Sequence, residues 1–271
     1  MRAAAQRLGV PTATLRSWSH RYGVGPPGHA PGRHRLYSDT DIAALRHMSK
    51  LIAKGVDARS AASAAMQALI PEPAQATALV AALFALEEFT AARLIERHLD
   101  HYGVLETWDS LIRPAFTAIA NQQAGGERCI DVEHLLSWTV MSCLQRIPMA
   151  RSDVAETTLL ACAENDSHTL PLEAVRAALS ERGHTTLMLG AAVPTAAVLD
   201  AIQRRATPIT VLLWAQTERT ADVAAVRALR RTRTPVLVAG PGWDRVRLPA
   251  AVAYLHSLTE AVERLNVVGT S

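Results

Sequence analysis

The sequence predicts a multidomain fold: an α-helical winged helix-turn-helix unit first, an α-helical four-helix bundle second, and an α/β doubly wound parallel sheet last. Three observations predict this order. Basic charge is concentrated in the first sixty residues, residues 74–150 show no strand-like alternation, and strand-like apolar runs alternate with helical runs from residue 157. We expect the three domains to occupy residues 1–70, 74–150 and 155–271.

Charge is distributed unevenly along the 271 residues. The first sixty carry ten Lys and Arg against three acids, a net charge of +7, whereas the remainder carries −4. A basic N-terminal segment followed by a mildly acidic remainder is typical of nucleic-acid-binding proteins. The ordinary alternative is that the basic side chains form a solvated surface without a nucleic-acid partner. The chain has no membrane-length apolar run and no signal peptide, and its three cysteines lack metal-site spacing. We therefore expect a cytoplasmic protein without membrane association.

The first 22 residues read as two short helices with a tight turn between them. Gly9 breaks the first helix, and Pro11 opens a second helix that carries Leu15 and Trp18 on one face. In a helix-turn-helix unit the second helix enters the major groove of DNA. The polar side chains that this helix would present to DNA are Thr12, Thr14, Arg16, Arg21 and Tyr22.

A segment rich in Gly and Pro leads into RHRLY, whose alternation predicts a β-hairpin wing. Arg33 and Arg35 fall on one face of that hairpin, where they can reach phosphates. His34 and Tyr37 complete the candidate DNA contacts. The next segment, SDTDIAALRHMSKLIAKG, predicts a helix that Ser38 caps and that has apolar residues at helical spacing.

The motifs LGVPTATLRSWSHRYGV, GRHRLYSDTDIAALR and LIAKGVDARSAAS make residues 3–66 similar to the MerR family of winged-helix transcription regulators. The resemblance implies binding to double-stranded promoter or operator DNA. Two features depart from the family: the short strand before the first helix is absent, and PEP at 71–73 stops the helix that relatives use to dimerise. We therefore expect a homo-oligomer that assembles through the C-terminal domains.

Residues 74–150 predict four helices with apolar faces at i, i+3 and i+4, which form a small bundle. Gly103 and the pair Gly125-Gly126 separate the later helices. The one conspicuous polar feature is Glu133-His134 near the start of the fourth helix. An acid there is an ordinary partner of the helix dipole and a lone His is more often a surface or core residue, so the pair alone does not define a site.

From residue 157 the alternation predicts a parallel doubly wound sheet with ligands at the carboxyl ends of its strands. The segment ENDSHTLP follows the first strand. There Asp166 can hold the proton on one ring nitrogen of His168 and direct the other outward, as carboxylates do for metal-binding histidines. We expect strands at 157–163, 184–190, 208–216 and 234–240, and helices at 170–183, 194–205, 219–232 and 250–265.

A helical bundle followed by this α/β unit resembles the cobalamin-binding modules of the methionine synthase type. With the winged helix in front, nearly the whole chain resembles the light-responsive, cobalamin-dependent MerR regulators of carotenoid genes. The resemblance implies adenosylcobalamin as the cofactor and His168 of the Asp166-x-His168 motif as the lower ligand of cobalt. It also implies that Glu133 and His134 cover the upper face of the corrin ring.

Four positions depart from the family pattern. Pro171 replaces the motif glycine, and Gln123 stands where a tryptophan normally caps the upper ligand. Trp214 and Pro241 occupy places where small residues make room for the nucleotide tail. These departures leave three alternatives: a weakened cobalamin site, a different flat ligand such as another tetrapyrrole, or no ligand at all. The further candidate cofactor-binding residues are Gln123, Trp214, Gly240 and Gly242.

The function predicted is that of a sequence-specific DNA-binding regulator whose C-terminal domains sense cobalamin or a related flat ligand. The alternative is the same DNA binder with a ligand-free sensor module used only for oligomerisation or protein docking. A cobalamin-dependent enzyme would give the basic N-terminal segment no role. Apart from the Asp166–His168 loop, the sequence contains no catalytic triad, phosphate loop or paired-carboxylate site, so we do not expect an enzyme.

Overall fold

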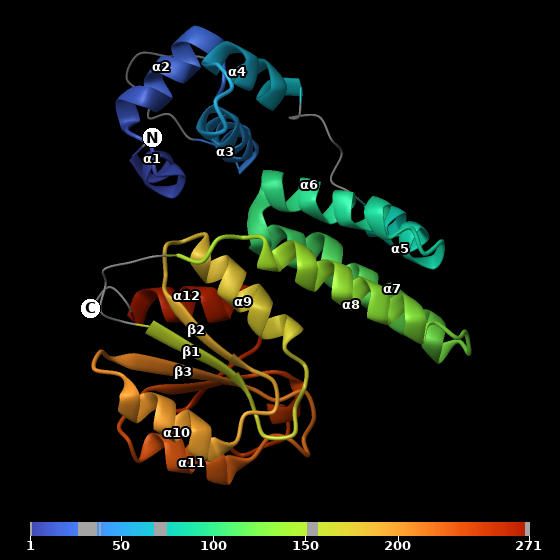
Figure 1. The fold of residues 1–271 in the computed structure, drawn as a ribbon, viewed down its shortest axis with the longest axis vertical. Coiled ribbons are helices and arrows are strands. Elements are labelled where there is room, and N and C mark those ends of the chain that lie inside the picture. The colour runs from blue at the N-terminus through green and yellow to red at the C-terminus, as the bar shows by residue number, and fades with distance from the viewer. Residues whose placement is uncertain (1, 27–36, 38, 68–74, 151–156, 269–271) are drawn as a thin grey trace. The chain divides into compact units, whose positions relative to one another are not determined.

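The computed structural model describes residues 2–26, 37, 39–67, 75–150 and 157–268 (Figure 1). The chain forms two compact units, residues 1–136 and 137–271, and each is described by itself. The division into three domains stays a prediction. None of the described helices combines the length and apolar character that a membrane crossing needs.

Four helices form the N-terminal part of the first unit: α1 (Arg2–Leu8), α2 (Thr12–Tyr22), α3 (Asp39–Ala53) and α4 (Ala58–Gln67). Gly9 has a φ of 64° in the turn between α1 and α2, a conformation that glycine adopts without strain. The four helices share a core of small residues with a few large ones, of which Leu15, Leu45 and Met48 are fully buried. The predicted helix-turn-helix is therefore confirmed, while the predicted wing falls almost entirely outside the described residues.

A helical region follows: α5 (Ala76–Phe84), α6 (Glu88–Thr107), a π-helical turn η1 (Trp108–Ile112), α7 (Arg113–Ala124) and α8 (Ile130–Gln145). Gly103 lies within α6 with a non-helical φ of 78°, so the helix is kinked there. The Thr107 hydroxyl donates to the Gly103 carbonyl at 2.7 Å and lies 2.9 Å from Nδ1 of His98. Because the single hydroxyl proton goes to Gly103, the His98 ring donates its Nδ1 proton to Thr107.

The second unit contains a parallel sheet with the strand order β2-β1-β3-β4-β5, which is the flavodoxin-like order. Helices α9 and α12 lie on one face of the sheet, and α10 and α11 lie on the other (Figure 1). Strands β1, β3 and β4 are almost entirely buried, as expected of apolar strands covered on both faces. The strands are β1 (Thr157–Cys162), β2 (Thr186–Gly190), β3 (Ile209–Trp214), β4 (Val236–Ala239) and β5 (Ala253–Leu255). The helices are α9 (Leu170–Ser180), α10 (Thr195–Arg204), α11 (Val223–Arg230) and α12 (Leu258–Val268), with a short 3-10 turn, η2 (Pro241–Trp243), after β4.

The predicted helix over residues 250–265 is wrong in its first part, because β5 forms there and pairs with β4. Three strand residues in an Ala- and Leu-rich segment carry almost no periodic signal, and pairing with β4 decides their conformation. Helix α12 begins only after Ser257, whose hydroxyl accepts a hydrogen bond from the Glu260 amide at 3.0 Å. The Ser-x-x-Glu spacing that marks this helix start was present in the sequence.

Candidate functional site: the Asp166–His168 loop and helix α2

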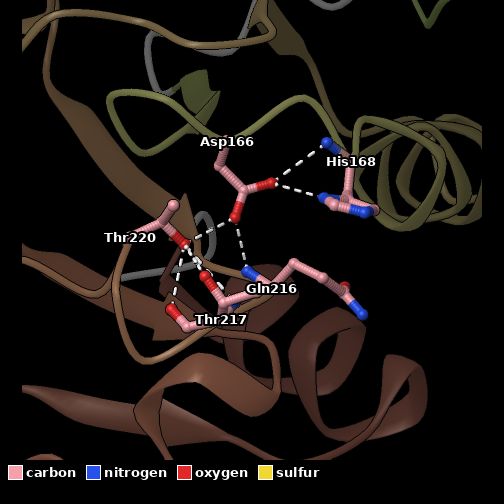
Figure 2. A network of polar contacts seen from close by, with 5 residues as sticks. All are labelled: Asp166, His168, Gln216, Thr217 and Thr220. Carbon is pink, nitrogen blue, oxygen red and sulfur yellow. Dashed lines mark hydrogen bonds and ion pairs between the residues drawn. The ribbon is translucent and has the colours of Figure 1, made fainter.

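The Asp166 carboxylate is the centre of the polar network at the carboxyl edge of the sheet (Figure 2). One oxygen accepts from the backbone amide of His168 at 3.0 Å and from Nδ1 of its ring at 2.9 Å. The other accepts from the Gln216 amide at 2.6 Å and from the Thr220 hydroxyl at 2.8 Å. Asp166 thereby joins the loop after β1 to the loop after β3.

The four donors keep Asp166 ionised although it is only 2% exposed. Burial acts to raise the pKa of the carboxyl group. The hydrogen bonds from Gln216, His168 and Thr220 outweigh burial, so the pKa of Asp166 lies below its usual value. A buried carboxylate with all of these donors in place can fix the orientation of an imidazole ring.

The His168 ring is held at one nitrogen and open at the other. Because Asp166 is acceptor-only when ionised, Nδ1 of the neutral ring carries the proton and Nε2 carries the lone pair. The side chain is 55% exposed, whereas that of Asp166 is 1% exposed. This is the arrangement in which a carboxylate sets the tautomer of a metal-binding histidine. Among the described residues, no group of three His, Cys, Asp or Glu side chains could hold a metal ion.

The loops after β3 and β4 approach each other at backbone distance. The Gly242 amide donates to the Ala215 carbonyl at 3.0 Å. A Cβ on Gly240 would lie 2.3 Å from the Ala215 oxygen, and a Cβ on Gly242 would lie 2.4 Å from the Thr217 oxygen. Both glycines are therefore required for this close packing, and their contact with a cofactor stays a prediction.

Trp214 ends β3 and packs beside this backbone. Its Cδ2 atom lies 3.0 Å from the position that a Cβ on Gly240 would take. Among the described side chains, the indole nitrogens of Trp214 and Trp243 are buried without a hydrogen-bond partner. A buried N–H group without a partner costs about 1–3 kcal/mol, so an acceptor reaching this edge would stabilise it.

Pro171, which departs from the family motif, fits its place in the fold. It lies in the first turn of α9, immediately after the Asp166–His168 loop. Proline is favoured there because that turn leaves its N–H groups without intrahelical partners. The substitution is therefore compatible with the observed geometry of Asp166 and His168.

The second group of predicted residues lies in the first unit. Gln123, near the end of α7, donates from Nε2 to the Glu133 carboxylate at 3.1 Å. Glu133 and His134 are exposed on α8, and Ile130 and Trp138 share the side of the helix on which His134 lies, at i−4 and i+4. Ile130 is 67% exposed and Trp138 is 65% exposed, so this side of α8 presents apolar surface.

The candidate DNA-contacting residues of α2 differ in their exposure, and their contact with DNA stays a prediction. Leu15 is buried in the core, and Thr12, Arg16 and Arg21 are exposed. Thr14 and Tyr22 are partly exposed. Tyr37 is partly exposed, and its hydroxyl group is buried without a partner among the described residues. Arg33, His34 and Arg35 lie outside the described residues.

Three members of the network were not among the predicted site residues: Gln216, Thr217 and Thr220. Thr217 Oγ1 lies 3.2 Å from Thr220 Oγ1 (Figure 2). The available signal was the segment QTERT, which begins at the last residue of the third predicted strand, because loops at the carboxyl ends of parallel strands meet at one edge.

The fold combines a helix-turn-helix unit, the kind of unit that binds DNA, with a doubly wound α/β domain. Residues 1–64 match the MerR HTH family regulatory protein model, and residues 156–265 match the B12 binding domain model. The chain is accordingly a transcriptional regulator of the MerR type with a C-terminal B12 binding domain, a class of regulators and not of enzymes.

Two relatives from Myxococcus xanthus are similar to this chain over most of their length. The chain is 27% identical to the HTH-type transcriptional repressor CarA over 289 aligned positions, covering 99% of this chain and 95% of CarA. It is 26% identical to the HTH-type transcriptional repressor CarH over 212 positions, 70% of each chain. The monomethylamine corrinoid protein of Methanosarcina barkeri shares the fold, with a TM-score of 0.54 and 15% identity over 70% of this chain and 96% of that one.

Proposed function

We propose that this regulator binds cobalamin and that His168 is the lower axial ligand of cobalt. The observation that carries the proposal is the Asp166–His168 pair, in which a buried carboxylate holds Nδ1 and leaves Nε2 with its lone pair on an exposed ring. The match of residues 156–265 to the B12 binding domain supports it. Cobalamin would supply a light-absorbing cobalt centre, and the protein would supply the imidazole and the surface around it.

We propose that the upper face of the corrin ring contacts the exposed side chains of α8. Glu133 and His134 are the residues that the resemblance assigns to this side. Gln123 holds Glu133 through a hydrogen bond, in the place where relatives have a tryptophan. The exposed Trp138, one turn beyond His134, is the aromatic surface that this chain offers instead.

We propose that the nucleotide tail of cobalamin does not enter the space between the loop that follows β3 and the loop that follows β4. The Trp214 side chain and the packing of Gly240 and Gly242 against Ala215 and Thr217 fill that place. Cobinamide has the corrin ring but no nucleotide tail. We expect cobinamide to bind within about threefold of cobalamin, because a tail that makes few contacts with the protein adds little affinity, and threefold corresponds to only about 0.7 kcal/mol.

The test is a spectroscopic titration of the full chain in the dark with adenosylcobalamin, hydroxocobalamin and dicyanocobinamide. Wild type should change the spectrum of each corrinoid, His168→Ala should lose the change that axial imidazole coordination causes, and Asp166→Ala should weaken binding about 10–100-fold. His20→Ala, which alters an exposed histidine of α2, is the matched control. A wild-type protein that leaves all three spectra unchanged would refute cobalamin binding and favour the ligand-free alternative.

DNA contact through α2 is proposed for Arg16 and Arg21. Each Arg→Ala substitution should weaken binding to a promoter fragment that the wild-type protein binds, and it should reduce the salt slope by about one for each lost phosphate contact. Fluorescence anisotropy at several salt concentrations measures both quantities. Arg113→Ala alters an exposed arginine of α7 and should leave both unchanged. Equal binding by Arg16→Ala, Arg21→Ala and wild type would refute this assignment.

We also propose that the chain acts as a homo-oligomer in the cytoplasm. Regulators with helix-turn-helix units read paired half-sites, which a symmetric dimer matches. Phe89 and Met149, which are 87% and 72% exposed, are apolar side chains outside the proposed ligand site that association would cover. Sedimentation of the full chain with and without adenosylcobalamin tests this, and a monomer at all concentrations in both conditions would refute it. An oligomer that forms without any corrinoid binding would support the ligand-free alternative.

A further inference from the structure

A cavity of the α/β unit lies at the edge of the sheet opposite to Asp166 and His168. It has a volume of about 440 Å³, and its wall includes Val236 and Ala253. These are the first residues of β4 and β5, which run parallel, so the cavity opens at the amino ends of the strands. Asp166 follows the carboxyl end of β1. The cavity is therefore separate from the proposed cobalamin site.

Three arginines line this cavity: Arg230, Arg233 and Arg264. They come from different elements, because Arg230 ends α11, Arg233 lies in the turn before β4, and Arg264 lies on α12. Helices α11 and α12 cover opposite faces of the sheet (Figure 1). The three guanidinium groups therefore reach this end of the sheet from the helices on both of its faces.

The positive charge of the cavity is not balanced within the described part of the chain. The residues of its wall include no Asp or Glu, and none of the described carboxylates lies within ion-pair distance of the three guanidinium groups. Like charges in one concavity repel, and an anion removes that repulsion. Arg230 is held in place by donating from one nitrogen to the Ala251 carbonyl at 3.0 Å, which leaves its other donors for a ligand.

The backbone around the cavity is held in uncommon conformations. Arg233 has a φ of 64° and Ala251 a φ of 65°, the left-handed region that residues other than glycine rarely adopt. Each costs roughly 1 kcal/mol or more, and such conformations persist where the surrounding structure determines them. Between Arg233 and the strand, Thr234 is 9% exposed, and its hydroxyl oxygen accepts a hydrogen bond from the Thr232 hydroxyl at 2.8 Å, so it is a fixed polar group in the wall.

We propose that Arg230, Arg233 and Arg264 form a binding site for a small anion that carries two or more phosphate groups. Guanidinium groups match phosphate oxygens in paired, planar hydrogen bonds, which makes arginine the preferred residue for such recognition. Three of them balance the charge of a diphosphate better than that of a single phosphate. The volume lies within the roughly 300–1,000 Å³ of small-molecule sites, so a nucleoside diphosphate fits the same chemistry.

The test is isothermal titration of the full chain with inorganic pyrophosphate, in a buffer without phosphate. Wild type should bind pyrophosphate saturably, and orthophosphate at least tenfold more weakly. Arg233→Ala and Arg264→Ala should each weaken pyrophosphate binding at least tenfold, and Arg233→Lys should restore part of the loss. Arg204→Ala, which alters an exposed arginine of α10, should leave pyrophosphate binding unchanged.

Two results would overturn the proposal. The first is the absence of saturable pyrophosphate binding by wild type, or binding that Arg233→Ala and Arg264→Ala leave intact while circular dichroism shows them folded. The second is a duplex DNA fragment whose affinity falls in Arg233→Ala and Arg264→Ala although pyrophosphate does not bind, which would assign the arginines to DNA phosphates instead. ADP titrated in parallel shows whether a nucleoside adds affinity beyond that of the diphosphate group.

Discussion

Replacing Asp166 by Asn keeps the size of the side chain, removes its charge and turns one acceptor oxygen into an NH2 group. The Thr220 hydroxyl can turn to accept from that group, because the Thr217 carbonyl, 2.9 Å away, can take the hydroxyl proton. The NH2 group will therefore face Thr220, and the Gln216 amide, 2.6 Å from the same position, will lose its acceptor. One lost bond to a charged group contributes about 1.5–3 kcal/mol, and weakening of the two bonds to His168 adds to it. We expect a local destabilisation of about 3 kcal/mol.

Hydrogen exchange measured by mass spectrometry on the peptide that contains Gln216 is the direct assay. A local loss of 3 kcal/mol corresponds to roughly hundredfold faster exchange of its amide. Asp222→Asn is the matched control, because Asp222 accepts only from the Ala224 amide at the start of α11 and asparagine caps a helix equally well. Unchanged exchange at Gln216 in Asp166→Asn would show that the carboxylate does not hold the two loops together.

The same carboxylate predicts a pH effect in the wild-type protein. The folded pKa of Asp166 lies below its ordinary value of 3.8, because the hydrogen bonds outweigh burial. Its stabilising contribution is therefore fully present above about pH 4 and is lost as the pH falls through the lowered folded pKa. Below pH 4 the protection factor of the Gln216 amide, which corrects for the slower intrinsic exchange in acid, should fall more in wild type than in Asp166→Asn, because only wild type has a carboxylate to protonate at this position.

Two further predictions concern stability. The pKa of His98 is lowered from its ordinary value of 6.5 to about 4, mainly by burial and to a smaller extent by the charge of His101. The unfolded chain therefore binds a proton at this residue more tightly than the folded chain does. The contribution of neutral His98 to the free energy of unfolding is present above pH 6.5 and falls as the pH is lowered. Between pH 7.5 and pH 5 the loss is about 2 kcal/mol. Urea unfolding should show this loss in wild type and not in His98→Asn. Gly242→Ala should destabilise by more than about 3 kcal/mol, because its Cβ would lie 2.4 Å from the Thr217 oxygen. Gly183→Ala, with open space around a φ of 76°, should cost only about 1 kcal/mol, and a smaller drop in Tm for Gly242→Ala than for Gly183→Ala would contradict this packing argument.

Most of the fold was predictable because its signals are local. Gly9 and Pro11 mark the helix-turn-helix, and the alternation of apolar runs with helices predicts a parallel sheet in the second unit. The strand β5 was not predictable, because its three residues adopt their conformation through pairing with β4 and not through their own sequence pattern. From the sequence, Gly103 indicated a break between two helices, whereas the structure has a kink at Gly103 within the single helix α6.

The site was predictable in part. Asp166 and His168 are two residues apart on one loop, so their contact follows from the sequence. Gln216 and Thr220 lie about fifty residues further along and reach Asp166 only because β1 and β3 are neighbours in the sheet. The hydrogen bond from Gln123 to Glu133 joins two helices across a turn, and no periodic pattern encodes such a contact.

The central position of β1 has a consequence for the order in which the domain can form during synthesis. Strand β1 lies between β2 and β3, and its first residue pairs with Ile209. At about 5–20 residues per second, the roughly fifty residues between the two strands take about 3–10 s to synthesise. Throughout that time one side of the apolar strand TTLLAC has no neighbour. Once β3 has emerged, β4 and β5 can add in chain order on the same side, so the nascent sheet grows outward from β3.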